Sequence, residues 1–363
     1  MVEQSPVERR PVVRRPPGRR ARILAVAAAR FHRDGYHRVS MAELAAEVGI
    51  TAPALYRHFR GKPELLRCAV ESGLDALCAA LAAGGAAELA GLALERRELG
   101  TLWQRDARLL PPAQRAALRR RLRTAVREVA AGEGELSWWA VLSAYGSLGH
   151  HGVVLPRRRY LELLLGMRER LLAVPEFGPV ADPLPVVAPG PADRREALVV
   201  AAARLFHRHG FDNVSTERLG AAVGIAGPSV YKHFGTKSAL LAAVLDRGRE
   251  QLRRDVLPVL GAGPGPAVAA FADFARRERD YLGVMLSETG RLAPGERRAA
   301  VDFRRGFLRD WVELAAAAGE PAAETRVRVH AMIAVAIDTA RSGAGSSAAV
   351  AAHAAAALGP GRG

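Results

Sequence analysis

The chain has 363 residues, a length that accommodates two or more ordinary domains with substantial buried cores. Its 53 basic side chains outnumber 37 acidic ones, and the resulting net charge of +16 favours a polyanionic partner such as nucleic acid. The first residues lack the apolar core of a signal peptide and no run of about 18 apolar residues follows, so we expect a cytoplasmic protein with no membrane partner.

The amino-terminal part of the chain predicts a basic arm followed by a small helical head. Residues 1–18 are rich in arginine and proline, and we expect them to be disordered. Three helices are then predicted: an amphipathic one that ends at Gly35, a short one capped by Ser40, and a third after the next glycine. Two short helices joined by such a turn form a helix-turn-helix, here within residues 19–66.

The sequence repeats itself. Residues 23–66 align without a gap with residues 198–241, and 20 of the 44 positions are identical. Weaker similarity continues beyond them, so the repeated unit is a whole protein of roughly 170 residues. Apolar residues recur at helical spacing throughout, which predicts an all-α chain of two tandem units. After the first head we expect a helical effector and dimerisation domain at 67–172, a Pro-rich linker at 173–193, a second head at 194–241, a second helical domain at 242–342 and an Ala/Gly-rich tail at 343–363.

The third helix of each head has the composition of a major-groove reader. At about 100° per residue, Leu55 and Phe59 face the core, while the opposite side faces outward with Tyr56 at its margin. A proline in the first turn can meet a thymine methyl, and Arg57 can donate two hydrogen bonds to guanine. The predicted DNA-binding residues are Ser40, Thr51, Pro53, Ala54, Tyr56, Arg57, His58 and Lys62 in the first head, and Ser215, Pro228, Ser229, Tyr231, Lys232, His233 and Lys237 in the second.

The lysines are confined to these two heads. Lys62, Lys232 and Lys237 fall in the equivalent stretches YRHFRGK and YKHFGTK, and every other basic side chain is arginine. A compact ammonium is a point-charge ligand for phosphate, whereas a planar guanidinium needs a different approach. We therefore interpret Lys62 and Lys237 as phosphate contacts; chance is the alternative. Ser40, at a helix N-terminus, is a further candidate for a phosphate contact.

Both repeats share the pattern G-Y/F-x-x-V-S…L-A/G…VGI…P-x-x-Y-x-HF-x-x-K, which resembles the TetR family of one-component bacterial transcription regulators. The resemblance implies a three-helix DNA-binding head followed by a helical domain that binds a small molecule and dimerises. Effector binding then changes the spacing of two heads and releases the operator. The DNA-facing positions that it implies are Pro53, Tyr56, Arg57, His58 and Lys62, with Pro228, Tyr231, Lys232, His233 and Lys237.

This chain departs from the family in carrying two heads, since the family normally has one head per chain and works as a homodimer. Gly227 and the absence of a polar cap at Ala226 predict a weaker start for the second recognition helix. The changes from Ala54 to Ser229 and from Arg57 to Lys232 predict that the heads prefer different half-sites. Either the two halves pair within one chain as a pseudo-dimer, or two chains form a homodimer with four heads.

The helical domains contain the candidate effector site. Trp103, Trp138 and Tyr145 are proposed to line a small-molecule pocket, with ordinary core packing as the alternative. The basic helix over 115–128 is predicted to be a solvated surface, with DNA contact as the alternative. The arginines of the arm, with Arg19 and Arg20, are candidates for phosphate or minor-groove contacts.

The function predicted from the sequence is that of a sequence-specific regulator, a ligand-responsive repressor of transcription that binds double-stranded operator DNA. No phosphate-binding loop, metal motif or catalytic motif occurs, so neither an enzyme nor a cofactor is expected. A nonspecific basic DNA-compacting protein is the alternative function, because charge alone would suffice for it.

Overall fold

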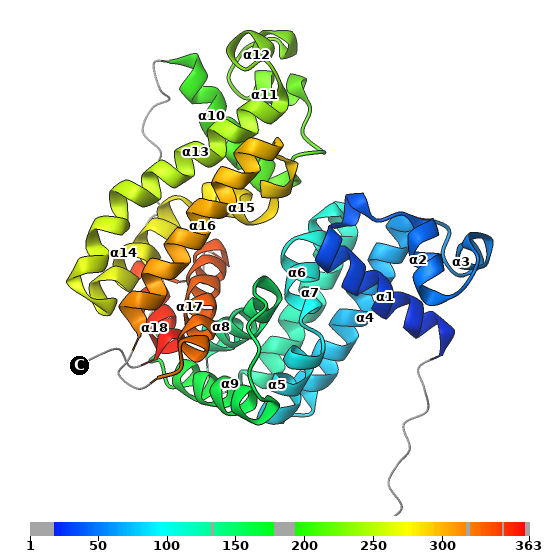
Figure 1. The fold of residues 1–363 in the computed structure, drawn as a ribbon, viewed down its shortest axis with the longest axis vertical. Coiled ribbons are helices and arrows are strands. Elements are labelled where there is room, and N and C mark those ends of the chain that lie inside the picture. Colours follow the sequence, from blue (N-terminus) through cyan, green and yellow to red (C-terminus); the bar gives the residue numbers. More distant parts are fainter. Residues whose placement is uncertain (1–17, 132–133, 178–192, 317–319, 343–344, 360–363) are drawn as a thin grey trace, which may run out of the picture. The chain divides into compact units, whose positions relative to one another are not determined.

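A computed structural model describes residues 18–131, 134–177, 193–316, 320–342 and 345–359 (Figure 1). Within these ranges the regular structure is helical and no strand occurs, which confirms the predicted all-α fold. The chain forms two compact units, residues 1–69 and 70–363. Nearly all of the predicted arm and most of the predicted linker lie outside the described residues.

The first unit contains the first head. Its elements are α1 (Arg19–Asp34), the 3-10 turn η1 (Tyr36–Arg38), α2 (Met41–Val48), α3 (Ala52–His58) and the beginning of α4 (Lys62–Ala82). Gly35 and Gly49 break the chain between helices with φ of 85° and 77°, a backbone region that other residues rarely adopt. The apolar faces of these helices meet in a core that includes Phe31, Leu44 and Phe59.

The second unit begins with the rest of the first copy. Its elements are α4, α5 (Ala86–Glu95), α6 (Glu98–Gln104), η2 (Asp106–Leu109), α7 (Pro112–Val129), α8 (Glu135–Gly146), η3 (Ser147–His150) and α9 (Arg157–Leu172). α7 begins at Pro112, and α9 begins at Arg157 directly after Pro156. Proline suits a helix start because the N–H that it lacks would have no partner within the helix. α4 runs through the predicted boundary between head and effector domain, so the two are joined by a continuous helix.

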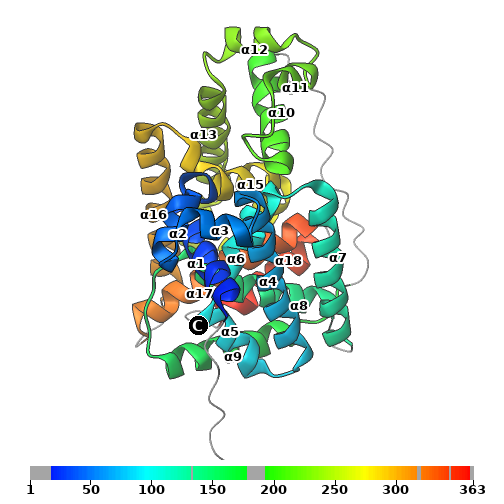
Figure 2. The ribbon, with the colours of Figure 1, turned by 90° about the vertical axis from the view of Figure 1, so that its right-hand side faces the viewer.

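The second copy follows in the same unit. Its head consists of α10 (Arg194–His209), α11 (Thr216–Ala221), α12 (Gly227–His233) and the start of α13 (Lys237–Asp255) (Figure 2). Beyond it come η4 (Leu257–Ala262), α14 (Pro264–Arg277), α15 (Arg279–Ser287), η5 (Thr289–Arg291), α16 (Pro294–Ala315), α17 (Ala322–Ser342) and α18 (Ser347–Leu358). Within the described ranges, each copy therefore contributes nine α-helices in the same order.

The segment predicted as an Ala/Gly-rich tail contains the packed helix α18. Ser346 caps this helix by accepting a hydrogen bond from Ala349 N at 3.1 Å. The side chains of Val350, His353 and Leu358 are buried, and α18 contacts α9, α14 and α17. Its alanine-rich composition suits this packing, because small side chains allow helices to approach closely.

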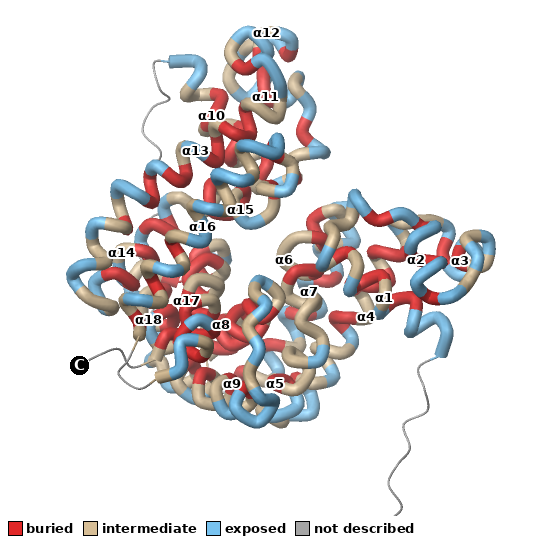
Figure 3. Tube along the Cα trace, in the orientation of Figure 1, coloured by how far each residue is buried: buried red, intermediate tan, exposed pale blue. Residues whose placement is uncertain are grey.

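The last two helices of each copy pack against each other across the middle of the second unit. α8 contacts α17 and α18, and α9 contacts α18 (Figure 1). Buried stretches run along α8 and α17, as Figure 3 shows. Polar contacts cross the same junction: Ser137 Oγ lies 3.0 Å from His353 Nε2, and Arg170 Nε donates to Ala356 O at 2.9 Å. The two copies are thus joined by a shared helical bundle.

Candidate nucleic-acid interface and ligand cavity

The third helix of the first head, α3, is anchored on one side and exposed on the other. Leu55 and Phe59 are buried, whereas Pro53, Arg57 and the rest of the outer side are accessible. Tyr56 is 52% exposed. Thr51, Tyr56, Arg57 and His58 are exposed, and Ala54 and Lys62 are partly exposed.

The second head repeats this arrangement on α12. Val230 and Phe234 are buried, and Tyr231 is 49% exposed, close to the value for its counterpart in the first head. Pro228 and Lys232 are exposed beside Tyr231. Ser215 is exposed, and Ser229, His233 and Lys237 are partly exposed. The exposed face of each helix therefore presents a proline, a tyrosine and a basic side chain.

The two heads differ at the start of their second helix. In the first head, Ser40 and Glu43 form a capping box: Glu43 N donates to Ser40 Oγ at 3.2 Å, and Ser40 N donates to Glu43 Oε2 at 2.7 Å. Ser40 Oγ also donates to the same carboxylate at 2.8 Å. These hydrogen bonds lower the pKa of Glu43, so the carboxylate stays charged. The Ser40 hydroxyl therefore already donates its hydrogen bond to the Glu43 carboxylate, which disfavours the predicted contact with a phosphate.

At the equivalent position the second head has Arg218 instead of Glu43. Ser215 still caps the helix, since Arg218 N donates to Ser215 Oγ at 3.2 Å. The guanidinium extends toward α10, where its Nη2 lies 2.7 Å from His209 Nε2. The first head thus has a carboxylate at this position and the second a guanidinium, although Glu217 places an acidic side chain in the same turn of the second head.

The lysines at the start of α4 and α13 have partners inside their own heads. Lys62 Nζ donates to His37 O at 3.4 Å and lies 4.4 Å from the ring centroid of Tyr36. Lys237 Nζ donates to Phe211 O and lies 4.3 Å from the ring centroid of Phe211. Burial lowers the pKa of both ammonium groups. Each lysine thus stabilises the turn after the first helix of its own head, an intramolecular role that the sequence analysis did not predict.

A second internal contact involves an arginine from the predicted arm region. Arg20 lies on α1 with its guanidinium 4.9 Å from the ring centroid of Phe59, and Arg195 is placed likewise 4.1 Å from Phe234. Arg195 Nη1 also donates to His233 O at 2.5 Å. These arginines cover the end of the third helix in each head, so Arg20 is not simply an extension of a DNA-binding arm.

The start of the second recognition helix also differs from expectation. Thr51 makes no side-chain capping bond to α3, so the lack of a polar residue at Ala226 does not distinguish the heads. Gly227 has a packing role: a Cβ there would lie 3.0 Å from the Cα of Glu217 on α11. Gly220 is similar, since its Cβ would lie 2.5 Å from Ile225 O. The helices of the second helix-turn-helix approach each other through two glycines where the first has alanines.

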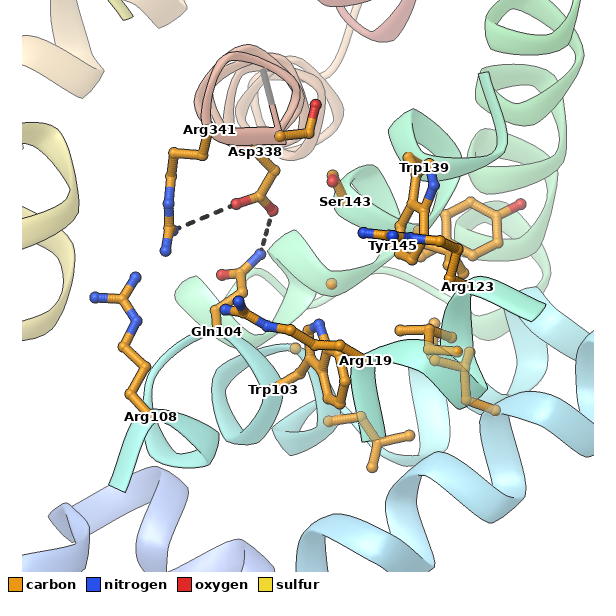
Figure 4. A pocket seen from close by; sticks show the side chains of 18 of the residues that line it. Trp103, Gln104, Arg108, Arg119, Arg123, Trp139, Ser143, Tyr145, Asp338 and Arg341 are labelled. Carbon is orange, nitrogen blue, oxygen red and sulfur yellow. Dashed lines mark hydrogen bonds and ion pairs between the residues drawn. The ribbon is translucent and has the colours of Figure 1, made fainter. Parts of the chain in front are cut away.

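A cavity of about 1090 Å³ lies in the second unit. Its walls come from α4 to α8 of the first copy, from α10 of the second head and from α17. Figure 4 shows Arg108 and Arg341 on one side, and Arg123, Trp139 and Tyr145 on the other. Gln104 Nε2 donates to Asp338 Oδ2 at 2.5 Å, and Arg341 Nη1 lies 3.6 Å from Asp338 Oδ1. The volume is sufficient for a drug-sized molecule.

Two of the three aromatic residues predicted to line a small-molecule pocket line this cavity, and the third does not. Trp103 and Tyr145 line it, and Tyr145 OH donates to Leu164 O at 3.0 Å. Trp138 does not line it: its side chain is buried against Arg168, whose guanidinium lies 5.0 Å from the indole centroid. The neighbouring Trp139 lines the cavity instead, with Nε1 donating to Glu135 Oε1 at 3.1 Å. Successive side chains of a helix point about 100° apart, so Trp138 faces the core while Trp139 faces the cavity.

The basic helix α7 presents a solvated surface, as predicted, since Arg119, Arg123 and Arg127 are exposed. These arginines and Arg115 also line the cavity, which the sequence analysis did not predict. Their spacing of four residues places them along one side of the helix. The buried side consists of Leu118, Leu122 and Val126. The signal was the regular spacing of the arginines, which charge alone did not reveal.

Comparison with known proteins identifies the two heads. Residues 23–69 and 198–244 each match the family described as "Bacterial regulatory proteins, tetR family". Over 73 residues, the chain is 34% identical to the HTH-type transcriptional regulator BetI of Agrobacterium fabrum, which covers 20% of this chain and 35% of that protein. The chain thus spans about a third of the length of this curated relative. Within the part of the chain that the structure describes, no helix is both long and apolar enough to cross a bilayer.

Two solved structures of regulators also match part of the chain. The TetR-family regulator PfmR of Thermus thermophilus is 24% identical with a TM-score of 0.39, and the match covers 48% of this chain and 100% of that one. The ketosteroid regulator KstR2 of Mycobacterium tuberculosis is 16% identical with a TM-score of 0.37, covering 42% and 85%. Both heads are arranged as three helices around a buried core and both are matched by the family, so the chain carries two amino-terminal domains of the TetR family.

Proposed function

We propose that the protein is a sequence-specific DNA-binding regulator of transcription with two reading heads in one chain. The observation that supports it is a repeated arrangement: α3 and α12 are each anchored by two buried apolar side chains, while Tyr56 and Tyr231 extend into solvent beside basic residues. A helix exposed in this way fits the major groove, where its side chains reach base edges. The net charge of +16 favours the phosphate contacts that such binding requires.

The heads are proposed to read unlike half-sites. Arg57 and Lys232 are exposed at equivalent positions, and only arginine can form a forked pair with guanine. Ala54 is replaced by Ser229, which adds a hydroxyl near the base edges. An asymmetric operator, in which each half carries its own sequence, follows from these differences.

Pairing of the two copies within one chain is proposed as the architecture. It is supported by the bundle of α8 and α9 with α17 and α18, because the same pair of helices from each copy takes part. Sedimentation or light scattering tests it. A mass near 38.7 kDa is expected for the free protein, whereas twice that mass would favour the homodimer with four heads.

Operator selection from random duplexes tests the central proposal. We expect one long asymmetric site, bound with a footprint over two successive half-sites. Tyr56→Ala with Arg57→Ala is expected to weaken binding to it about tenfold or more, because each base contact contributes about 1–3 kcal/mol. Tyr231→Ala with Lys232→Ala should remove protection from the other half-site.

Arg158→Ala is the matched control, since it also removes a positive charge but lies on α9, where the side chain is 92% exposed. Its operator affinity should stay within about twofold of the unmodified protein. Equal affinity for operator and random duplexes at physiological salt would overturn the proposal in favour of a DNA-compacting protein. A repressor further requires that the protein lowers transcription from a promoter that contains the selected site, and that the head variants restore it.

A further inference from the structure

The lining of the cavity is strongly cationic. Nine arginines line it, against two carboxylates, Glu135 and Asp338. Both carboxylates already have arginine partners: Arg127 Nε lies 2.9 Å from Glu135 Oε2, and Arg341 lies 3.6 Å from Asp338. The cavity therefore holds positive charge that its own acidic residues do not balance.

Two arginines in the middle of α7 carry much of this excess. Within the described residues, neither Arg119 nor Arg123 forms an ion pair, whereas Arg115 and Arg127 at the ends of the row have contacts with protein groups. Partial burial, followed by repulsion from Arg115 and Arg341, lowers the pKa of Arg119. An anion placed between Arg119 and Arg123 would relieve this repulsion.

Arg108 shows the same imbalance in a more enclosed place. Its side chain is 8% exposed, and its Nη1 donates to the neutral Ser287 Oγ at 3.3 Å. Burial, followed by repulsion from Arg341, lowers its pKa to about 9. Glu288 and Asp338 offset part of the cost of burying this guanidinium, and an anionic occupant would offset more of it.

The rest of the wall is apolar. Trp103, Trp139 and Tyr145 contribute aromatic surface, and leucines such as Leu77 and Leu89 contribute aliphatic surface. Burying the hydrocarbon part of a ligand against such surface contributes about 25 cal/mol per Å². The lining thus suits a molecule with an apolar body and an anionic group, and it would reject a cation.

The corresponding helices of the second copy pack differently. Phe271 on α14 and Phe307 and Trp311 on α16 are all buried, and their ring centroids lie 5.9 to 6.2 Å apart. Aromatic side chains thus pack together between α14 and α16, the counterparts of α5 and α7. Among the described residues, the cavity with the cationic lining lies in the first copy.

One wall of the cavity belongs to the second head. His207, Arg208 and His209 form the last turn of α10, the first helix of that head. His207 Nδ1 is buried and has no hydrogen-bond partner within the described residues. A Cβ on Gly283 of α15 would lie 1.8 Å from the same atom, so the ring is held tightly. A molecule bound in the cavity would therefore contact the second head beside His207, a side chain that is held in place.

We infer that this cavity binds an amphipathic organic anion between the arginines of α7 and the apolar wall, and that the bound molecule acts on the second head through α10. The binding step is independent of the proposed DNA-binding function, whereas the regulatory step rests on it. The ligand of the first copy would then control the head of the second copy.

A pair of fluorescent probes tests the binding step. 8-Anilinonaphthalene-1-sulfonate carries an anionic group on an aromatic body, and N-phenyl-1-naphthylamine is the same body without the sulfonate. The sulfonate is expected to bind about tenfold more tightly, which corresponds to about 1.4 kcal/mol. Arg119→Gln with Arg123→Gln should weaken sulfonate binding about tenfold and leave binding of the neutral probe within about twofold.

Arg120→Gln with Arg121→Gln is the matched control, because it removes the same charge from the same helix at positions that do not line the cavity. Sulfonate binding to this variant should remain within about twofold. If the control loses as much affinity as the cavity variant, or the two probes bind equally, the assignment of an anion site is wrong. Circular dichroism of each variant shows whether it is folded.

Hydrogen exchange tests the regulatory step without DNA. With the sulfonate probe bound, amides of α10 should exchange more slowly, while those of α1 in the first head should be unchanged. Unchanged exchange in α10 at saturating probe would overturn the regulatory step. Failure of operator binding in a separate assay would overturn the proposed function and leave the anion site standing.

Discussion

Arg159 on α9 and Glu324 on α17 form a two-point ion pair between the two copies of the repeat. Arg159 Nε donates to Glu324 Oε1 at 2.7 Å, and Nη2 donates to Oε2 at 2.8 Å. The two ends differ in environment, since Glu324 is 4% exposed and the side chain of Arg159 is 53% exposed. A planar guanidinium fits a carboxylate in this way, so the pair fixes the relative position of α9 and α17.

Removing each partner should therefore have unequal effects. Arg159→Ala leaves a buried carboxylate without its arginine, and we expect a clear fall in Tm. Glu324→Ala leaves the arginine in water, and the fall should be smaller. Arg158→Ala, which removes a surface arginine from the same helix, should leave Tm nearly unchanged. Equal falls in Tm for Arg159→Ala and Glu324→Ala would show that the burial of Glu324 does not determine the loss of stability.

Two histidines at the same junction predict a loss of stability in acid. The rings of His151 and His330 lie 4.6 Å apart. Burial lowers the pKa of both, and each opposes protonation of the other. The other charged or titratable neighbours, Arg97, His150, Arg304 and Arg326, are all cationic when protonated.

The sign of the effect follows from proton binding. An unfolded histidine takes up a proton below about pH 6.5, whereas the folded pair stays neutral to lower pH. Stability is therefore complete above that pH and decreases as the pH falls through it. His330→Gln should flatten the dependence by at most about 1.4 kcal/mol per pH unit in denaturant titrations.

The close approach of α11 and α12 predicts that Gly220→Ala destabilises the second head. Alanine improves helix propensity by about 1 kcal/mol, but overpacking against Ile225 O costs about 1–3 kcal/mol. Hydrogen exchange in α11 and α12 should accelerate. Gly235→Ala is the control, because its Cβ would meet nothing within 4 Å. A more stable second head in the Gly220 variant would contradict the close contact.

The internal contacts of Lys237 predict that it stabilises its head in the absence of DNA. Lys237→Ala removes a hydrogen bond to Phe211 O and a cation–π contact, and we expect a loss of about 1 kcal/mol in denaturant unfolding. Lys232→Ala removes an exposed lysine from the same heptapeptide and should leave stability unchanged while weakening operator binding. If Lys237→Ala weakens DNA binding with no change in stability, its main partner is phosphate.

Local rules were sufficient to predict the first head from its sequence. The helix expected after Ser40 is observed over Met41–Val48 with its capping box, and glycines end helices where they were placed. These features depend on neighbours within a few residues. The equivalent helix of the second head is shorter and ends at Ala221.

Features that depend on distant parts of the chain were harder to predict. Trp138 and Trp139 are adjacent and chemically identical, so only the packing of α8 determines which one reaches the cavity. The arginines of α7 are solvent-exposed as predicted, but the sequence could not place them at a cavity, because the opposing wall comes from α10 and α17, far along the chain. Similarly, the alanines of α18 carry no strong signal until the helices around them are known.

The shared bundle makes association of the two copies unimolecular. A tether keeps linked surfaces at an effective concentration of the order of millimolar, so dilution in the cell would not separate them. Two single-headed chains with different reading helices would assort into three kinds of dimer. In this fusion each molecule always contains one Arg57 head and one Lys232 head, in equal number, however few molecules the cell makes.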